Sequence, residues 1–103
     1  MAEFTGNRHI TCGIRNEIPI ELQTIMWDMI DEDRDSNKKL DYLQVFELKP
    51  KYTNGTGIQE IIHSQEQPCR KKKVTVESDD PIYSKIFVID DISHSTMLLN
   101  HEY

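Results

Sequence analysis

His63 and Cys69 form the pair of side chains in this sequence that comes nearest to a catalytic arrangement. A nucleophilic cysteine needs a base and an electropositive surrounding that stabilises its thiolate, and Arg70 directly follows Cys69. Pro68 and a strand-like alternation separate the two side chains, so the sequence leaves their relation in space open. A small enzyme that uses His63 and Cys69 is therefore one hypothesis. A surface histidine beside an unreactive thiol is the other, and the sequence favours it.

The sequence shows no metal-binding motif, and we expect neither a metal nor a cofactor. Asp90 and Asp91 follow an apolar stretch, where adjacent carboxylates hold a hard cation only if further oxygen ligands join them. Turn residues that end a strand explain these two aspartates better. The histidines lack the spacing of a zinc site; they are His9, His63, His94 and His101.

A run of four basic residues, Arg70, Lys71, Lys72 and Lys73, offers a place for phosphate contacts. The run is a small footprint, and the whole chain has a formal net charge of −6. A nucleic-acid accessory protein that binds through these residues is an alternative function. The other interpretation is a solvated sheet edge whose lysines discourage pairing with another sheet.

The negative charge is concentrated between Glu17 and Asp35, where seven acidic residues accompany one basic residue, Arg34. Acidic side chains in the last turn of a helix oppose the helix dipole, so stability alone does not favour them there. They are explained by a basic partner protein, by the basic run within the same fold, or by ordinary solvation with Lys38 and Lys39 nearby. The sequence leaves these three explanations open.

One clear helix is predicted from about residue 19 to 33, opened by Pro19. Its core-facing stripe follows helical spacing and consists of Leu22, Ile25, Met26, Met29 and Ile30. Ile20 and Trp27 lie on another flank, and an exposed tryptophan between acidic residues is typical of an interface anchor. The predicted protein-binding surface is Ile20, Trp27, Asp28, Asp31 and Glu32. The alternative is that the N-terminal segment or the C-terminal tail covers Trp27.

Strands are predicted over residues 9–14, 40–48, 57–65, 73–77, 84–89 and 96–100, with a hairpin turn at Asn54-Gly55. The 40–48 strand has apolar residues on both faces and is expected at the centre of the sheet. Short links favour antiparallel neighbours. The prediction is an α+β fold of order β-α-β-β-β-β-β, a single curved antiparallel sheet of five to six strands with one main helix on one face.

Residues 1–103 are expected to form a single domain with a loose N-terminus over residues 1–7. The chain lacks a signal peptide and a long apolar run, so a cytoplasmic location is expected. Cys12 and Cys69 are expected to be buried or half-buried free thiols, because a disulfide is disfavoured in that compartment.

Three segments together resemble a known family. They are Ile18-Pro19-Ile20-Glu21-Leu22-Gln23 with Met26-Trp27, then Leu40-Asp41-Tyr42-Leu43-Gln44-Val45-Phe46-Glu47-Leu48, then Ile89-Asp90-Asp91 with Ser95-Thr96-Met97-Leu98-Leu99. The chain resembles domain-of-unknown-function family 960, small proteins of Gram-positive bacteria, their phages and staphylococcal cassette elements. The resemblance implies no reaction and no catalytic residue. It implies a setting in which small proteins often bind and redirect host factors.

The leading hypothesis is a non-catalytic protein-binding module from a phage or mobile element. It would act on a basic or DNA-handling factor of the host or the element, as an inhibitor or as a nucleic-acid mimic whose carboxylates stand for phosphates. No membrane association is expected. A homodimer that pairs the acidic helix with the basic run is compatible with each hypothesis.

Overall fold

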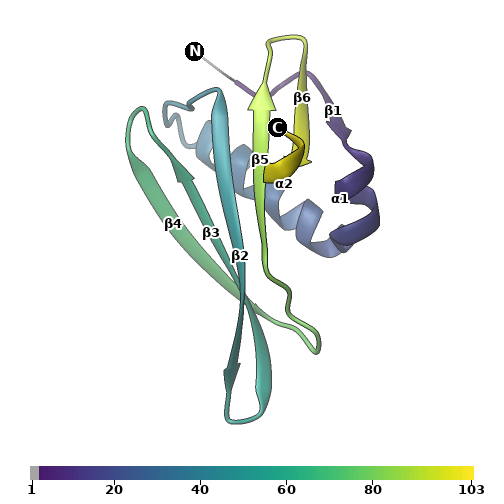
Figure 1. Cartoon of the computed structure of the whole chain (residues 1–103). Coiled ribbons are helices and arrows are strands. Elements are labelled where there is room, and N and C mark those ends of the chain that lie inside the picture. The colour runs from purple at the N-terminus through teal and green to yellow at the C-terminus, as the bar shows by residue number, and fades with distance from the viewer. Residues whose placement is uncertain (1–2) are drawn as a thin grey trace.

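The structure, a computed structural model, describes residues 3–103. Its elements are β1 (Asn7–Ile10), α1 (Cys12–Glu17), α2 (Ile20–Asp35), β2 (Leu43–Thr53), β3 (Thr56–Gln65), β4 (Arg70–Glu77), β5 (Ser84–Asp90), β6 (His94–Leu99) and the short 3-10 helix η1 (Asn100–Glu102). The strands form one sheet in the order β1-β6-β5-β2-β3-β4, and α2 lies across one face of it (Figure 1). The α+β class is therefore confirmed, and β2 is a central strand as predicted.

The sheet is mixed, so the prediction of a purely antiparallel sheet is wrong. β1 runs parallel to β6, with Asn7 beside His94 and Ile10 beside Met97. The other neighbours are antiparallel. Short connections do produce the β2–β3, β3–β4 and β5–β6 pairs. The chain then returns from β4 to place β5 on the far side of β2.

The predicted element order is also wrong, because a second helix follows β1. The predicted strand over 9–14 ends at Ile10, and α1 begins at Cys12. Thr11 caps this helix, since its side-chain oxygen accepts a hydrogen bond from the Ile14 N–H at 3.3 Å. Cys12 is therefore on an exposed helix surface. Cys69 is exposed as well, so the expectation of buried thiols is wrong for both free cysteines.

The main helix and the hairpin follow their sequence signals. Four members of the predicted stripe in α2 are buried, and the fifth, Ile25, is half-buried against them. They pack on strand residues such as Phe46, Leu48 and Ile61. Asn54 and Gly55 have φ angles of 51° and 80°, the left-handed geometry that the β2–β3 turn requires.

The N-terminal segment is held in place from residue 3 onward, which corrects the expectation of a loose segment there. Phe4 is 0% exposed, and the backbone N–H groups of Glu3 and Phe4 donate to an Asp90 carboxylate oxygen at 3.2 and 3.4 Å. Residues 1 and 2 of the predicted loose segment lie outside the described residues. Asp90 thus anchors the chain start.

Two features are absent from residues 3–103. No group of three or more histidine, cysteine or acidic side chains is arranged to hold a metal ion. No helix in this range is long and apolar enough to cross a membrane.

Candidate functional site

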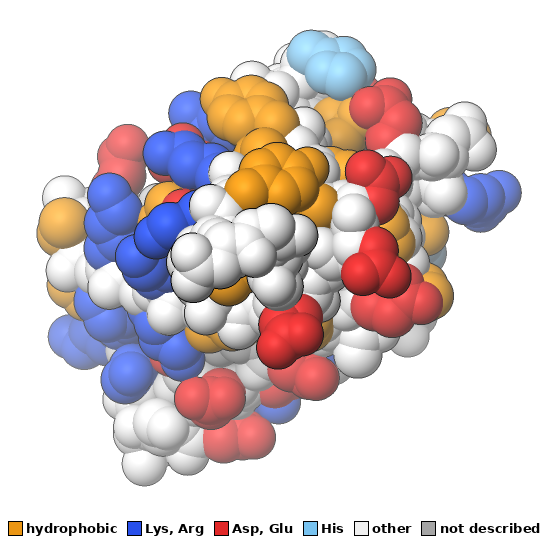
Figure 2. Space-filling view, turned by 90° about the horizontal axis from the view of Figure 1, so that it is seen from below, with side chains coloured by type: hydrophobic (Ala, Val, Ile, Leu, Met, Phe, Trp, Pro, Cys, Tyr) orange, Lys and Arg blue, Asp and Glu red, His pale blue; other side chains and the backbone are white. Residues whose placement is uncertain are grey.

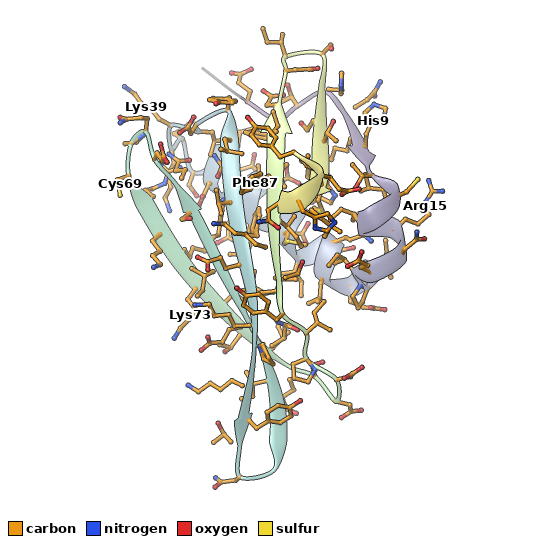
Figure 3. The ribbon with its side chains drawn as sticks, viewed as in Figure 1. His9, Arg15, Lys39, Cys69, Lys73 and Phe87 are labelled. Carbon is orange, nitrogen blue, oxygen red and sulfur yellow. The ribbon has the colours of Figure 1, made fainter. Side chains whose placement is uncertain are left out.

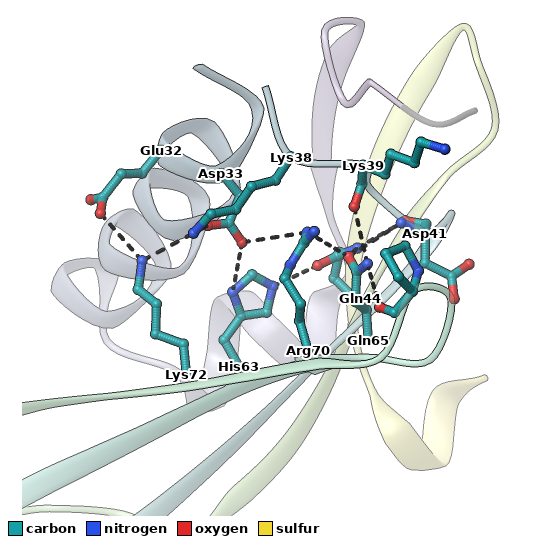
Figure 4. Close-up of polar contacts among 11 residues, drawn as sticks. Glu32, Asp33, Lys38, Lys39, Asp41, Gln44, His63, Gln65, Arg70 and Lys72 are labelled. Atoms are coloured by element: carbon teal, nitrogen blue, oxygen red, sulfur yellow. Dashed lines mark hydrogen bonds and ion pairs between the residues drawn. The ribbon is translucent and has the colours of Figure 1, made fainter. Parts of the chain in front are cut away.

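A polar pocket of about 190 Å³ lies between the C-terminal end of α2 and strands β3 and β4 (Figure 4). Its lining residues are Asp33, Lys38, Gln44, His63, Ser64, Gln65, Arg70, Lys71 and Lys72. Cationic and amide side chains predominate among them. The pocket is therefore a polar hollow at the rim of the apolar core.

Strand register brings the pocket side chains to the same face of the sheet. Directly opposite residues of an antiparallel pair point to the same side. His63 lies opposite Lys72, and Gln65 lies opposite Arg70, so these four side chains share the face that α2 covers. The last turn of α2 then places Asp33 above them. The same alternation sends Lys71 and Lys73 to the opposite face.

The Asp33 carboxylate is the centre of the site. Its side chain is only 7% exposed, yet three cations surround it: Lys38 Nζ at 3.5 Å, Arg70 Nη2 at 3.9 Å and Lys72 Nζ at 3.9 Å. A direct charge-assisted hydrogen bond is roughly 2.7–2.9 Å long. The three cations thus surround the carboxylate at distances longer than a direct hydrogen bond.

His63 forms the floor of the pocket. Its ring stacks on Phe46 with centroids 4.3 Å apart, and Nε2 lies 2.6 Å from Gln44 Oε1, so Nε2–H donates to that oxygen. Nδ1 then faces Asp33 at 3.9 Å. Burial lowers the pKa of His63 from 6.5 to about 4; Asp33 raises it, and Lys72 and Arg70 lower it further. The imidazole is consequently neutral at neutral pH.

Two buried glutamines position these groups. Gln65 Oε1 accepts hydrogen bonds from Gln44 Nε2 at 2.9 Å and Arg70 Nη2 at 3.1 Å. Gln65 Nε2 donates to the backbone oxygens of Lys39 and Pro68 at 3.0 and 2.9 Å. The amides therefore hold Arg70 in place and tie the loop after α2 to the β3–β4 turn.

The predicted enzymatic pair does not share this pocket. Cys69 is exposed in the β3–β4 turn (Figure 3), whereas His63 points inward at Asp33 (Figure 4). The predicted basic run is divided as well. Arg70 and Lys72 line the pocket with their side chains, while Lys73 pairs with Glu60 on the other face at 3.7 Å.

The acids at the end of α2 have partners within the fold. Pairing with the basic run is one of the three explanations that the sequence leaves open for these acids. Glu32 accepts from Lys72 at 3.2 Å, and Asp33 faces Lys72 and Arg70. Asp31 pairs with Arg34 at 3.0 Å and with Arg8. These contacts bring the basic run to the negative end of the helix dipole.

The predicted protein-binding residues on α2 differ in exposure. Ile20 is 64% exposed, and Asp28 and Glu32 are exposed. Trp27 is half-buried, and the Arg8 guanidinium of β1 lies 4.7 Å from the centroid of its ring. The N-terminal segment thus covers Trp27 in part, and binding of a protein through this surface stays a prediction.

Sequence reasoning missed Asp33, Lys38, Gln44 and Gln65 as parts of one site. A signal for the amides was present. Gln44 alternates with Phe46 and Leu48, and Gln65 alternates with His63 and Ile61, so both occupy positions where the strand period places core residues. A glutamine at such a position indicates a buried polar network.

Comparisons with known proteins identify a family of unknown function. A crystal structure of a protein of unknown function from Enterococcus faecalis is similar over 100% of this chain and 97% of that chain, with a TM-score of 0.74 and 24% identity. That likeness shows the fold alone. No match was found among curated proteins. A family model described as staphylococcal protein of unknown function (DUF960) matches residues 7–102, so the chain belongs to this family.

Proposed function

We propose that this protein is a small non-catalytic binding protein that takes an anionic group, such as a phosphate, into the pocket around Arg70 and Lys72. The observation that supports this proposal is the convergence of three cations on a hollow that contains one buried carboxylate. The rest of the protein is acidic, with a formal net charge of −6 for the chain. A local excess of positive charge inside an acidic protein is a selective place for an anion.

The cations keep hydrogen-bond donors available. Arg70 has five N–H donors in a fork that fits oxyanions, and one of them serves Gln65. Lys72 has three donors and uses one on Glu32. A hollow of about 190 Å³ has room for several water molecules or for an oxyanion. The site therefore offers both the charge and the space.

The properties of His63 fit a role in binding better than a role in acid–base catalysis. An effective general base has a pKa near the working pH, whereas the pKa of His63 is lowered to about 4. Its Nε2–H is also held by Gln44. In the proposed role, the neutral ring supplies a rigid floor under the bound group. Protein binding through Ile20, Trp27, Asp28, Asp31 and Glu32 remains a separate prediction.

Phosphate is expected to stabilise the wild-type protein, and Arg70→Gln and Lys72→Gln are expected to reduce that effect. Loss of one hydrogen bond to a charged group corresponds to about 1.5–3 kcal/mol, or roughly a tenfold to hundredfold weaker affinity. Phosphate binding is measured as the rise in melting temperature with phosphate concentration, against chloride at equal ionic strength. Lys85→Gln is the matched control, because it removes one charge from an exposed position on β5.

Asp33→Asn sharpens the test, because Asp33 competes with the anion for the same cations. This variant is expected to be less stable without phosphate and to bind phosphate more tightly than the wild type. Equal stabilisation by phosphate and chloride would contradict the proposal. An equal loss of phosphate stabilisation in Arg70→Gln and Lys85→Gln would also contradict it, because that result reports only general surface charge.

A further inference from the structure

Strand β4 leaves one long edge of the sheet unpaired. It has eight residues, lies at the end of the strand order, and pairs only with β3 among the described elements. The N–H and C=O groups on its outer side form no backbone ladder within residues 3–103. Such an edge is a template for another strand. The opposite edge strand, β1, has only four residues.

The charge order along β4 is complementary to itself when the strand is reversed. Its first half is Arg70-Lys71-Lys72-Lys73, and its end is Glu77, followed by Asp79 and Asp80. Antiparallel pairing of two copies therefore brings the basic half of one strand to the acidic end of the other. Figure 2 shows one face of the whole molecule, where blue side chains gather mainly on one side and red ones mainly on the other.

We propose that β4 pairs antiparallel with β4 of a second copy of this chain, with the two-fold axis at Thr75, so that two six-stranded sheets become one. This register places Lys73 opposite Glu77 of the second copy, on the face away from α2. It places Val74 opposite Val76 of the second copy, on the α2 face. Opposite charges and β-branched residues are favourable cross-strand partners.

Neighbouring registers are less complementary. An axis at Lys73 places the two Lys73 side chains directly opposite each other, and like charges at such positions are destabilising. An axis at Val74 places Lys71 opposite Glu77, but it also places the Lys72 side chain opposite Val76, a charge beside an apolar residue. Of these three axes, only the one at Thr75 pairs opposite charges without placing a lysine opposite a lysine or an apolar side chain.

The residues that the pairing uses are available on the surface. The Lys73 side chain is 56% exposed and points outward on the β4 side of the sheet (Figure 3). Its present partner, Glu60, has a second lysine, Lys51, at 3.9 Å, so Glu60 keeps a partner when Lys73 turns to the second copy. Glu77 is exposed and has no ion pair within residues 3–103.

A hollow beside the acidic end of β4 fits the same arrangement. It has a volume of about 640 Å³, and its apolar floor includes Leu22, Ile25 and Val76. Its acidic rim consists of Glu17, Glu21, Glu77, Asp79 and Asp80. In the proposed register, the basic start of β4 from the second copy arrives beside this rim. No cationic side chain of residues 3–103 lines this hollow.

The experiment is sedimentation equilibrium of the full chain, with four proteins compared at low and high salt. They are the wild type, Lys73→Glu, Glu77→Lys and the double variant Lys73→Glu/Glu77→Lys. The wild type is expected to dimerise. Each single variant is expected to weaken the dimer tenfold or more, because each creates two like-charge pairs across the axis. The double variant is expected to recover the wild-type dissociation constant, because it exchanges the two charges.

Mixing the two single variants gives an independent reading, since their opposite edges are complementary and should form a heterodimer. Lys85→Glu is the matched control and should dimerise like the wild type. A monomeric wild type at every concentration would overturn the proposal and assign the lysines the role of blocking edge pairing. A dimer that is insensitive to both charge reversals, or that the double variant fails to restore, would place the contact elsewhere and overturn it equally.

Discussion

Acidification from pH 6.5 to about pH 4 is expected to remove on the order of 3 kcal/mol of the free energy of unfolding through His63 alone. The pKa of this histidine is 6.5 when unfolded and about 4 in the fold, mainly because the ring is buried. Below pH 6.5 the unfolded chain binds a proton that the folded chain does not accept until about pH 4. The neutral ring thus contributes its full stabilisation above pH 6.5 and loses it between pH 6.5 and about pH 4. Below about pH 4 this histidine adds no further change with pH.

Urea unfolding at pH 7.5 and at pH 4.5 measures this effect, with His63→Gln as the comparison. Glutamine keeps an N–H donor for Gln44 but does not titrate. Wild type is expected to lose roughly 2–3 kcal/mol more than the variant between the two pH values. Asp91 and Glu102 have lowered pKa values through their hydrogen bonds, and they stabilise the fold above their unfolded pKa values in both proteins. An identical pH dependence in wild type and variant would show that the buried ring does not control this loss.

Phe4→Ala is expected to destabilise the protein by about 3–5 kcal/mol, although the residue lies near the start of the chain. The side chain is 0% exposed and belongs to the main hydrophobic cluster with Ile30 and Met97. Its removal leaves a cavity that the neighbouring strands fill only in part. Phe4 also has a φ angle of 53°, an unfavourable region for a bulky residue, so packing holds it there.

Thermal or urea unfolding of Phe4→Ala and Thr5→Ala tests this role. Thr5 is the exposed neighbour, and its substitution is expected to change stability by no more than about 0.5 kcal/mol. If both variants unfold like the wild type, the N-terminal segment does not contribute to the core. The expectation of a loose N-terminal segment would then hold.

Local patterns predicted the parts of the fold that depend on local physics. The spacing of Leu22, Met26 and Met29 requires a helix against a core, and Asn54-Gly55 requires a tight reversal. Strand partners depend instead on contacts between distant segments. The sequence around Asn7 contains no signal that this residue pairs with His94 rather than with a residue in the first half of the chain.

The missed helix α1 shows how two periods compete. Ile10, Cys12 and Ile14 alternate as in a strand, while Ile14 and Ile18 have the spacing of one helical turn. Thr11 caps the first turn and thereby favours the helix over a strand. The exposed position of Cys12 follows from that choice.

The candidate site was predicted in fragments. In the sequence, Asp33 is one of several acids at the helix end with three open explanations, and His63 pairs with Cys69 because the two are close along the chain. The true neighbours of His63 arrive from α2 and β4, and their meeting depends on the β3–β4 register. Pairing within the fold was among the explanations for the acidic helix end, and the contacts of Asp33 and Glu32 select it.

The parallel pairing of β1 with β6 has a consequence for how the chain acquires its structure during synthesis. Strands β2, β3 and β4 pair with near neighbours in the sequence, whereas β1 has no neighbour to join until β6 has been made. Residues 7–10 must wait for residues 94–97, nearly the whole length of the chain later. Contacts of such long sequence separation slow folding, typically to milliseconds or longer. Among the described strands, β1 is therefore expected to join the sheet last, and its four residues stay unpaired until β6 is available.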